Sequence, residues 1–358
     1  MEDIITKFNY LENIIIYSLI AFFASFILYP LYINFLKKLK AWAMIREDTT
    51  WGGSAEIYSK LHSHKVWTPT MWGGLILLIV ALLVLFSYVL QYAGVISFTL
   101  VEREETYILL FAFFSMWILG LLDDFTEIKG KGALKWLTAK MKLVWMFGFA
   151  GFIAFWFYDR LWVSTVDLRP IAASLDFGLF FPVIAFFITL AIVNAINITD
   201  WLDWLVGGLS VIVLFVLWIL TFFYGWYLAT TLIWIVLGAT LAFLRFNINP
   251  AKVFLGDSWS LALWGIVSAL VFLLNINVGI VVPFSILFGI FILEVTTSFL
   301  QITWKRLLGK KLFPIAPFHH WLEYKWNPEY SIVMKLWVIQ WVLAWITLVM
   351  IFYQFHII

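Results

Sequence analysis

Polar residues that could do chemistry stand at the ends of long apolar runs in this sequence. Two adjacent aspartates close one run in LGLLDDF, Asn and Asp residues close another in NAINITDWLD, and two histidines stand in APFHHWLEYKW. Carboxylates at the edge of a bilayer are costly to dehydrate, so they are usually paired, metal-bound or functional. The candidate site residues of these segments are Asp123, Asp124, Asn194, Asn197, Asp200, Asp203, Asn247, Lys252, Asp257, His319 and His320.

The carboxylates predict a divalent cation. Asp123 and Asp124 would repel each other if both were ionised and close, and a cation would relieve that repulsion. Because the carboxylates offer only oxygen ligands and the chain has no Cys, Mg²⁺ or Mn²⁺ is favoured over zinc. Bound Mg²⁺ usually joins a few carboxylates to a substrate phosphate. Lys65, Lys142 and Lys252 could hold a diphosphate beside it.

These parts favour phosphoryl transfer. That reaction needs positioning, a metal across the diphosphate and positive charge around its oxygens, with little covalent work for the protein. A lipid acceptor would explain why the site lies at a membrane boundary.

Each cluster also has a purely structural interpretation. The paired aspartates could form a solvated helix end, and the paired histidines could be interfacial side chains. Asn197 or Thr199 could cap the helix that follows. The convergence of all the clusters on one face of the membrane favours a functional site over these separate explanations.

The composition predicts an all-α polytopic membrane protein. Of 358 residues, 64% are hydrophobic and 12% are charged, which is more apolar than a soluble domain can hide from water. The absence of Cys excludes disulfides and thiolate chemistry. The start MEDIITKFNYLEN lacks the features of a cleaved signal peptide, so we expect the first apolar run to be retained. Residues 1–358 are expected to form a single integral membrane domain with no nucleic-acid partner.

A spanning helix needs about 20 apolar residues, and ten runs meet that requirement approximately. The fourth and the eighth are the ones that we would omit first if the count were too high. The candidate spans are 13–36, 72–91, 107–122, 143–158, 175–196, 205–222, 225–244, 261–275, 279–300 and 335–354.

The distribution of positive charge predicts the orientation. The alternate connections 37–71, 123–142, 197–204, 245–260 and 301–334 carry 18 of the 23 Lys and Arg residues. Cytoplasmic loops carry the excess of Lys and Arg, so we expect these connections to be cytoplasmic and both termini to face outward. The same connections hold nearly all the candidate site residues, which predicts an active site on the cytoplasmic face.

Five segments, in chain order, resemble the signature motifs of the phospho-N-acetylmuramoyl-pentapeptide transferase family. They are VWTPTMWGG, LGLLDDF, NAINITDWLDWL, VFLGDSWSLALWG and APFHHWLEYKW. The resemblance extends over about residues 37–335. The resembled family belongs to the wider superfamily of polyprenyl-phosphate N-acetylhexosamine-1-phosphate transferases.

The resemblance implies an enzyme with ten transmembrane helices in the bacterial inner membrane, acting in peptidoglycan synthesis. The phosphate of undecaprenyl phosphate would attack UDP-N-acetylmuramoyl-pentapeptide and give lipid I and UMP, with Mg²⁺ as cofactor. A homodimer is also implied.

The resemblance assigns roles by motif. Asp257 would be the principal metal ligand, and Asp123 and Asp124 would lie beside the metal and the lipid phosphate, one of them as the base. His319 and His320 would lie near the diphosphate. The residues implied at the nucleotide pocket and its rim are Lys65, Lys142, Asn194, Asn197, Asp200, Asp203, Asn247 and Lys252.

Two alternatives to this reaction remain. The APFHH segment followed by LEYK resembles the muramoyl-pentapeptide branch, but Trp321 stands where that motif has a third His. A sibling transferase using UDP-N-acetylglucosamine or another UDP-amino sugar is therefore one alternative. The other is a transporter or a catalytically inactive lipid-binding homologue.

Tryptophan occupies positions where the resembled motifs have glycine. Glycine serves where φ is positive or where backbones approach closely, and Trp fits neither situation without strain. Our hypothesis is that the gene reads UGA as glycine, with genuine divergence as the alternative. Trp321 replaces His rather than Gly and is not part of the set. The positions concerned are Trp67, Trp72, Trp117, Trp136, Trp201, Trp204, Trp259, Trp264 and Trp326.

Overall fold

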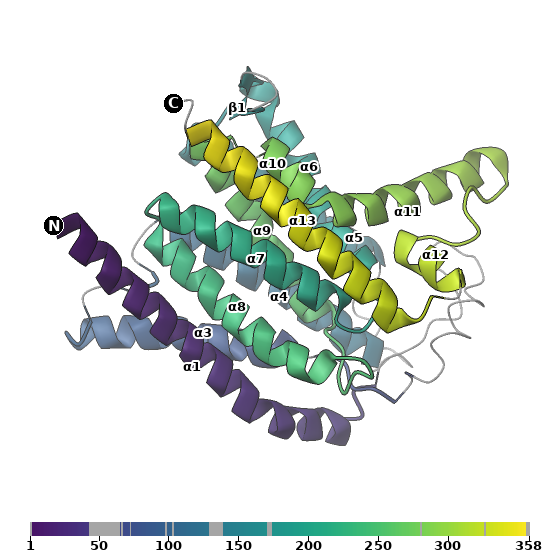
Figure 1. The fold of residues 1–358 in the computed structure, drawn as a ribbon, viewed down its shortest axis with the longest axis horizontal. Coiled ribbons are helices and arrows are strands. Elements are labelled where there is room, and N and C mark those ends of the chain that lie inside the picture. Colours follow the sequence, from purple (N-terminus) through teal and green to yellow (C-terminus); the bar gives the residue numbers. More distant parts are fainter. Residues whose placement is uncertain are drawn as a thin grey trace.

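The fold is a bundle of long helices with one short hairpin, seen here in a computed structural model (Figure 1). The structure describes residues 2–42, 65, 67–71, 73–96, 99–101, 104–128, 139–169, 174–279, 281–325 and 327–355. The helices are α1 (Glu2–Lys38), α3 (Gly73–Tyr92), α4 (Glu104–Ile128), α5 (Ala139–Arg160), α6 (Phe181–Thr199), α7 (Leu205–Phe223), α8 (Tyr227–Asn247), α9 (Asp257–Val278), α10 (Val281–Leu287), α11 (Gly289–Leu308), α12 (Phe318–Tyr324) and α13 (Glu329–Phe355).

The helices confirm the expected membrane architecture. Nine helices in the described part of the chain are long and apolar enough to cross a bilayer, and α10 with α11 supplies a tenth span if that pair is counted as one. The pair bends by 76° at its break. Neither the fourth nor the eighth candidate span has to be omitted, because α5 and α9 are continuous helices. The irregular span is the ninth, which consists of α10 and α11.

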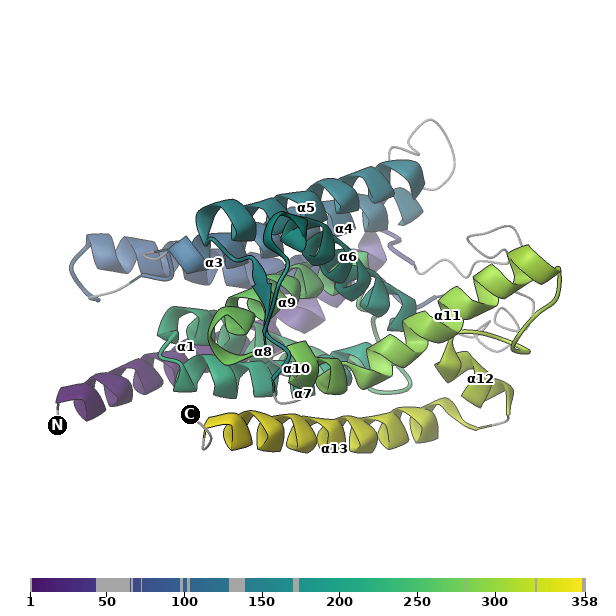
Figure 2. The ribbon, with the colours of Figure 1, turned by 90° about the horizontal axis from the view of Figure 1, so that it is seen from above.

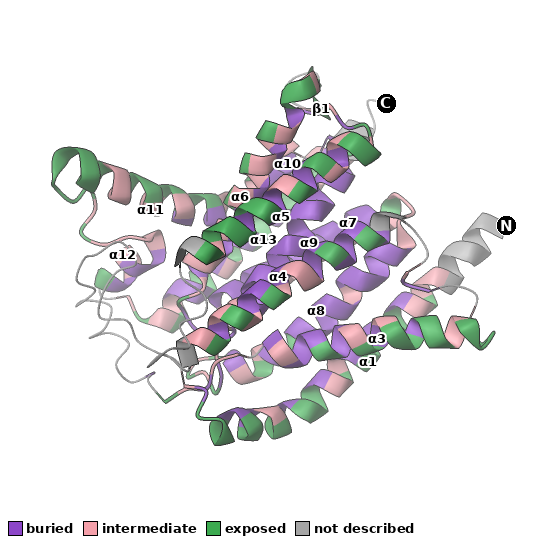
Figure 3. Cartoon of the chain, turned by 180° about the vertical axis from the view of Figure 1, so that it is seen from behind, coloured by how far each residue is buried: buried purple, intermediate pink, exposed green. Residues whose placement is uncertain are grey.

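Helix α9 runs through the middle of the bundle (Figure 2). It is buried along almost its whole length, and α4 packs along it more extensively than any other helix pair (Figure 3). Glycines permit this close packing. A Cβ on Gly265 would lie 2.4 Å from the backbone oxygen of Ala112, and one on Gly120 would lie 2.2 Å from that of Asp257. Small residues at such seams let membrane helices approach each other.

The outer helices expose apolar side chains, as contact with lipid requires. Phe155 on α5 is 59% exposed, and Val338 and Val349 on α13 are each 63% exposed. A water-soluble protein would not leave surfaces of this extent uncovered. Polar backbone groups in these helices are satisfied within each helix, which is the condition for spanning a bilayer.

The ends of the helices carry the polar clusters at one end of the bundle. Side-chain hydrogen bonds join helix ends to helix starts there: the end of α4 to the start of α5, the end of α6 to the start of α9, and the end of α8 to the start of α7. Both chain termini lie at the opposite end (Figure 1), as an even number of crossings requires.

The hairpin at the other end of the bundle consists of β1 (Thr165–Val166) and β2 (Leu175–Asp176), which pair antiparallel, followed by the short 3-10 helix Gly178–Phe180. Asn275 in the last turns of α9 fastens it, because its side chain accepts from the Asp167 N–H and donates to the Thr165 carbonyl.

The predicted orientation can be tested with single cysteines, since the chain has none. Tyr92 ends α3 at the terminal end of the bundle, and Lys310 follows α11 at the polar end; both are exposed. We expect Tyr92→Cys to react with a membrane-impermeant maleimide in intact spheroplasts. Lys310→Cys should react only after permeabilisation. The reverse pattern would contradict a cytoplasmic site with both termini outside.

Candidate active site

Asp257, the first residue of α9, is the centre of the polar cluster. Its Oδ1 accepts a hydrogen bond from Asn197 Nδ2 at 2.8 Å, and its Oδ2 accepts one from Lys142 Nζ. Its charge also acts on Asp123, Asp124 and Asp200. Four carboxylates, one lysine and one amide therefore converge from α4, α5, α6 and α9.

Asp124 faces the backbone of α9. Its Oδ1 accepts from the Asp257 N–H at 2.8 Å and its Oδ2 from the Ser258 N–H at 3.0 Å. These N–H groups begin a helix and have no partner within it, and the helix end favours an anion. Gly256 precedes them at φ +79°, and a Cβ there would lie 2.8 Å from Asp124 Oδ2. The buried Asp124 side chain thus caps α9 and holds Asp257 in place.

Asp123 faces the opposite way, toward Lys142. The Lys142 ammonium hydrogen-bonds to Asp123 Oδ2 as well as to Asp257 Oδ2. The lysine offsets the repulsion that the two carboxylates would otherwise exert on each other. The adjacent aspartates of LGLLDDF therefore serve different partners.

The oxygen donors around Asp257 fit Mg²⁺. Within the described ranges, no group of three or more His, Cys, Asp or Glu side chains is arranged to hold a metal ion. Mg²⁺ does not require such a cage, since it commonly binds one or two carboxylates, several waters and substrate phosphate. Asp123, Asp257 and the carbonyl oxygen of Asn197 supply such a set, with Lys142 at the place where their charges meet.

Asp200 ends α6 beside this set. Burial in the protein interior, followed by the nearby charge of Asp257, raises the pKa of Asp200 to about 8. The shift reflects the removal of Asp200 from water first and the nearby charge of Asp257 second. A cation or a second proton donor would be attracted to the same place.

A second buried network lies next to the first. Lys65 Nζ donates to Asp203 Oδ1 and to Glu329 Oε1, each at 2.7 Å. The other oxygen of Asp203 accepts from Asn249 Nδ2 at 3.0 Å and from the Ala251 N–H at 3.1 Å. Asp203 thereby joins the turn after α6, the loop after α8 and the start of α13.

Asn247 also connects the turn after α6 with the loop after α8. Its Oδ1 accepts from the Trp204 N–H at 2.7 Å, and its Nδ2 donates to the Val253 carbonyl at 2.9 Å. The Lys65 ammonium lies 5.7 Å from the centre of the Phe254 ring. Lys65, Asp203 and Asn247 therefore shape the wall of the site by fixing its loops.

The histidine segment forms α12 and is anchored by Glu294. This carboxylate, fully buried on α11, accepts from the His319 N–H at 3.2 Å and lies 3.1 Å from His319 Nδ1. His320 Nδ1 pairs with Glu323 Oε2 at 2.7 Å. The His320 ring lies 6.2 Å from that of Trp201, which connects α12 with the Asp200 turn.

Two predicted residues, and Trp321, are not in these networks. Asn194 donates to the Leu190 carbonyl of its own helix, and Lys252 is exposed, with no ion pair in the described part of the chain. The side chain of Trp321 contacts Lys325, whose Nζ lies 3.8 Å from the centre of the Trp321 ring. The capping alternative was wrong for Asn197 and Thr199, because they bond Asp257 and the Ala195 carbonyl.

Two functional carboxylates escaped the sequence analysis. Glu294 stands alone in the apolar run FGIFILEVTTSFL, and a charged residue inside a span is itself a signal of function. Glu329 follows a proline at the start of the last helix, where an acidic residue is ordinary. Only the first could have been found from the sequence.

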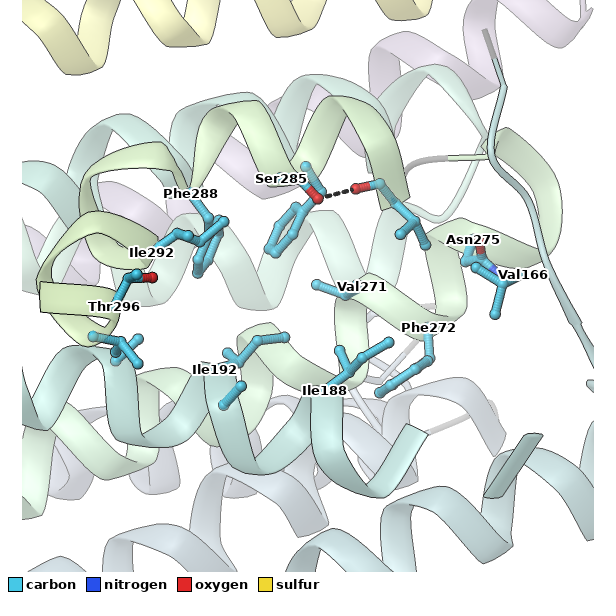
Figure 4. A pocket seen from close by; sticks show the side chains of 15 residues that line it. Val166, Ile188, Ile192, Val271, Phe272, Asn275, Ser285, Phe288, Ile292 and Thr296 are labelled. Atoms are coloured by element: carbon cyan, nitrogen blue, oxygen red, sulfur yellow. Dashed lines mark hydrogen bonds between the residues drawn. The ribbon is translucent and has the colours of Figure 1, made fainter. Parts of the chain in front are cut away.

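An apolar cavity of about 340 Å³ lies between α6, α9, α10 and α11 (Figure 4). Ile188 and Ile192 on α6 face Phe288 and Ile292 on the bent pair across it. Its lining is almost entirely hydrocarbon, with Asn275 at the end near the hairpin. The cavity therefore suits an apolar chain rather than a polar ligand.

The raised pKa of Asp200 predicts a pH-dependent stability in Mg²⁺-free buffer. An unfolded Asp loses its proton near pH 4, whereas the folded side chain retains it until about pH 8. The unfolding free energy should therefore fall as pH rises from about 4 to about 8. Thermal unfolding in detergent with a chelator should show this slope, and Asp200→Asn should make it shallower. An unchanged slope in that variant would contradict the shift.

Comparison with known proteins identifies the family. Residues 106–275 match glycosyl transferase family 4. The chain is 32% identical over 330 residues to the phospho-N-acetylmuramoyl-pentapeptide-transferase of Anoxybacillus flavithermus, covering 92% of this chain and 95% of that protein. It is 32% identical over 331 residues to the protein of the same name from Bacillus licheniformis, covering 91% and 94%.

A third relative of that name, from Geobacillus sp. strain WCH70, is 32% identical over 332 residues, with 92% and 95% covered. These similarities run through every segment that supplies the Asp257 cluster. The chain belongs to the phospho-N-acetylmuramoyl-pentapeptide-transferase family.

Proposed function

We propose that this protein transfers phospho-N-acetylmuramoyl-pentapeptide from its UDP donor to undecaprenyl phosphate in the bacterial inner membrane, producing lipid I and UMP. The observation that carries the proposal is the convergence of Asp123, Lys142, Asn197 and Asp257 at the ends of four membrane helices. Family membership supplies the reaction class.

The reaction forms one P–O bond and breaks another. An oxygen of the lipid phosphate attacks the sugar-linked phosphorus of the donor, and the bond to the UMP phosphate breaks. Lys142 supplies positive charge to the diphosphate oxygens, while Asn197 orients Asp257. Bound Mg²⁺, held by Asp257 and Asp123, would neutralise charge on the diphosphate and on the leaving UMP.

Asp123 is the base in this proposal. Both oxygens of Asp124 already receive backbone N–H groups of α9, so Asp124 cannot turn to a substrate without uncapping that helix. The side chain of Asp123 instead contacts the side chains of Lys142 and Asp257, so it can turn to a substrate without uncapping a helix. It can therefore take a proton from the lipid phosphate.

The apolar cavity supports a lipid acceptor. Its walls come from α6, which carries Asn197 at its end, and from the bent pair α10–α11. An isoprenoid chain in it would gain van der Waals packing against the helices while its phosphate reached toward Asn197. The polar groups gather at one end of the bundle, whereas transporters usually hold their substrates near the midplane.

The donor can be tested with purified protein, undecaprenyl phosphate and Mg²⁺. UMP release is measured with UDP-N-acetylmuramoyl-pentapeptide and with UDP-N-acetylglucosamine, for the chain as written and for a variant with glycine at Trp204 and Trp259. We expect release only with the first donor. Release only with the second would identify a sibling transferase. No release with either donor from either protein would favour an inactive lipid-binding homologue.

The adjacent aspartates allow a matched pair of variants in the protein that is active in this assay. Asp124→Ala removes two hydrogen bonds to a buried helix end, so we expect it to destabilise the protein by about 2 kcal/mol. Asp123→Ala removes one of the two carboxylates on Lys142, but Lys142 keeps Asp257 as a partner and Asp257 loses a like-charged neighbour, so this variant should be destabilised much less. Its UMP release should nevertheless fall by about 10²-fold or more, the range of a general base.

Thermal unfolding and UMP release are measured on both proteins, with Mg²⁺ present. Equal destabilisation by the two substitutions would contradict the separate roles. Retention of full activity in Asp123→Ala would show that this carboxylate is not the base.

A further inference from the structure

Some tryptophan positions have surroundings that suit glycine better than an indole. The chain has 22 Trp and only 20 Gly, although membrane helices are unusually rich in glycine. Three properties separate these positions from ordinary ones: a left-handed backbone, a shielded indole N–H without a partner, and a close approach of neighbouring backbones.

Trp204 has the backbone conformation of a glycine. It precedes α7 at φ +54° and ψ 0°, in the left-handed region that bulky residues rarely adopt. Its N–H is fixed by Asn247, so the conformation cannot relax without breaking the contact between the two loops. Its ring lies 5.3 Å from that of Trp337.

Seven indole N–H groups are shielded from solvent and have no hydrogen-bond partner within the described part of the chain. A buried Trp normally places this donor against an acceptor, and an unpaired one costs free energy. A single such group would be unremarkable, but seven form a pattern. They belong to Trp117, Trp204, Trp218, Trp234, Trp259, Trp264 and Trp337.

The start of α9 shows the third property. A Cβ on Gly73 would lie only 2.4 Å from the Trp259 backbone nitrogen, so α3 and α9 meet backbone to backbone beside this residue. Trp264 is fully buried and stands four residues after Ser260 and four before Ser268. Small residues at this spacing form the seams of membrane helices, and an indole interrupts the row.

Other tryptophans have at most one of these properties. Trp162 also has a left-handed φ of +54° but is 87% exposed. The unpaired N–H is the one property found at Trp117, Trp218, Trp234 and Trp337. Trp345 is 66% exposed on α13, as suits a lipid-facing side chain, and Trp321 makes its cation–π contact with Lys325. Trp67 is 73% exposed, and Trp201 contacts His320, so the structure makes no demand for glycine at either. The positions Trp72, Trp136 and Trp326 lie outside the described residues.

We propose that positions 204, 259 and 264, which have two of these properties each, hold glycine in the protein as the cell makes it, inserted at UGA codons. Glycine removes three unpaired N–H groups, relieves the left-handed strain at 204 and restores the small-residue row of α9. The site then keeps the backbone shape that holds Asn247 and Asp257. The proposal rests on backbone geometry and does not depend on the transferase reaction.

The direct test is peptide mass spectrometry of the protein purified from its native membranes. We expect glycine at positions 204, 259 and 264, and tryptophan at 321 and 345. Tryptophan at 204, 259 or 264 would overturn the proposal. This readout is independent of UMP release, so it separates a failure of this inference from a failure of the proposed function.

A second test uses recombinant protein and thermal unfolding. Trp204→Gly should raise the midpoint, whereas Trp345→Gly, the same change in an exposed helix interior, should lower it because glycine weakens a helix. Trp204→Ala should fall below Trp204→Gly by about 2 °C, since only glycine tolerates this φ freely. A lowered midpoint in Trp204→Gly, or Ala equal to Gly, would contradict the proposal.

Discussion

The site depends on the capping of one buried helix end. The first N–H groups of α9 lie deep in the protein, where an unpaired donor would cost free energy. Asp124 satisfies two of them at 2.8 and 3.0 Å, from a helix that packs along α9 for most of its length. This contact sets the direction of Asp257, and the positions of Lys142 and Asn197 follow from it.

The surrounding charges obey the same constraint. Asp203, Glu329 and Glu294 bind Lys65 or backbone N–H groups of loops and helix starts. Asp123 and Asp257 are held instead by the side chains of Lys142 and Asn197. Side chains can move aside for a cation or a diphosphate, whereas backbone contacts fix the neighbouring network, and this difference favours the Asp257 cluster as the place for both.

Sequence reasoning located the clusters but could not assign every partner. The ten apolar runs and the polar residues at their ends predicted the helices and the shared end of the bundle. The 3.6-residue repeat does not reveal which of two adjacent aspartates faces a neighbouring backbone, so the roles of Asp123 and Asp124 needed the structure. The same holds for Asn247, whose two contacts join segments distant in sequence from each other.

The break in the ninth span was also hidden from hydropathy, since both of its parts are apolar. The helix after the break, α11, contacts two different parts of the protein. Ile292 and Thr296 of α11 line the apolar cavity, and Glu294, between them in sequence, holds His319. Because residues two apart on a helix point in different directions, α11 presents one side to hydrocarbon and another to α12. Helix α11 is therefore one rigid element that connects the apolar cavity, which suits a lipid chain, with the histidines of α12 beside the Asp200 turn.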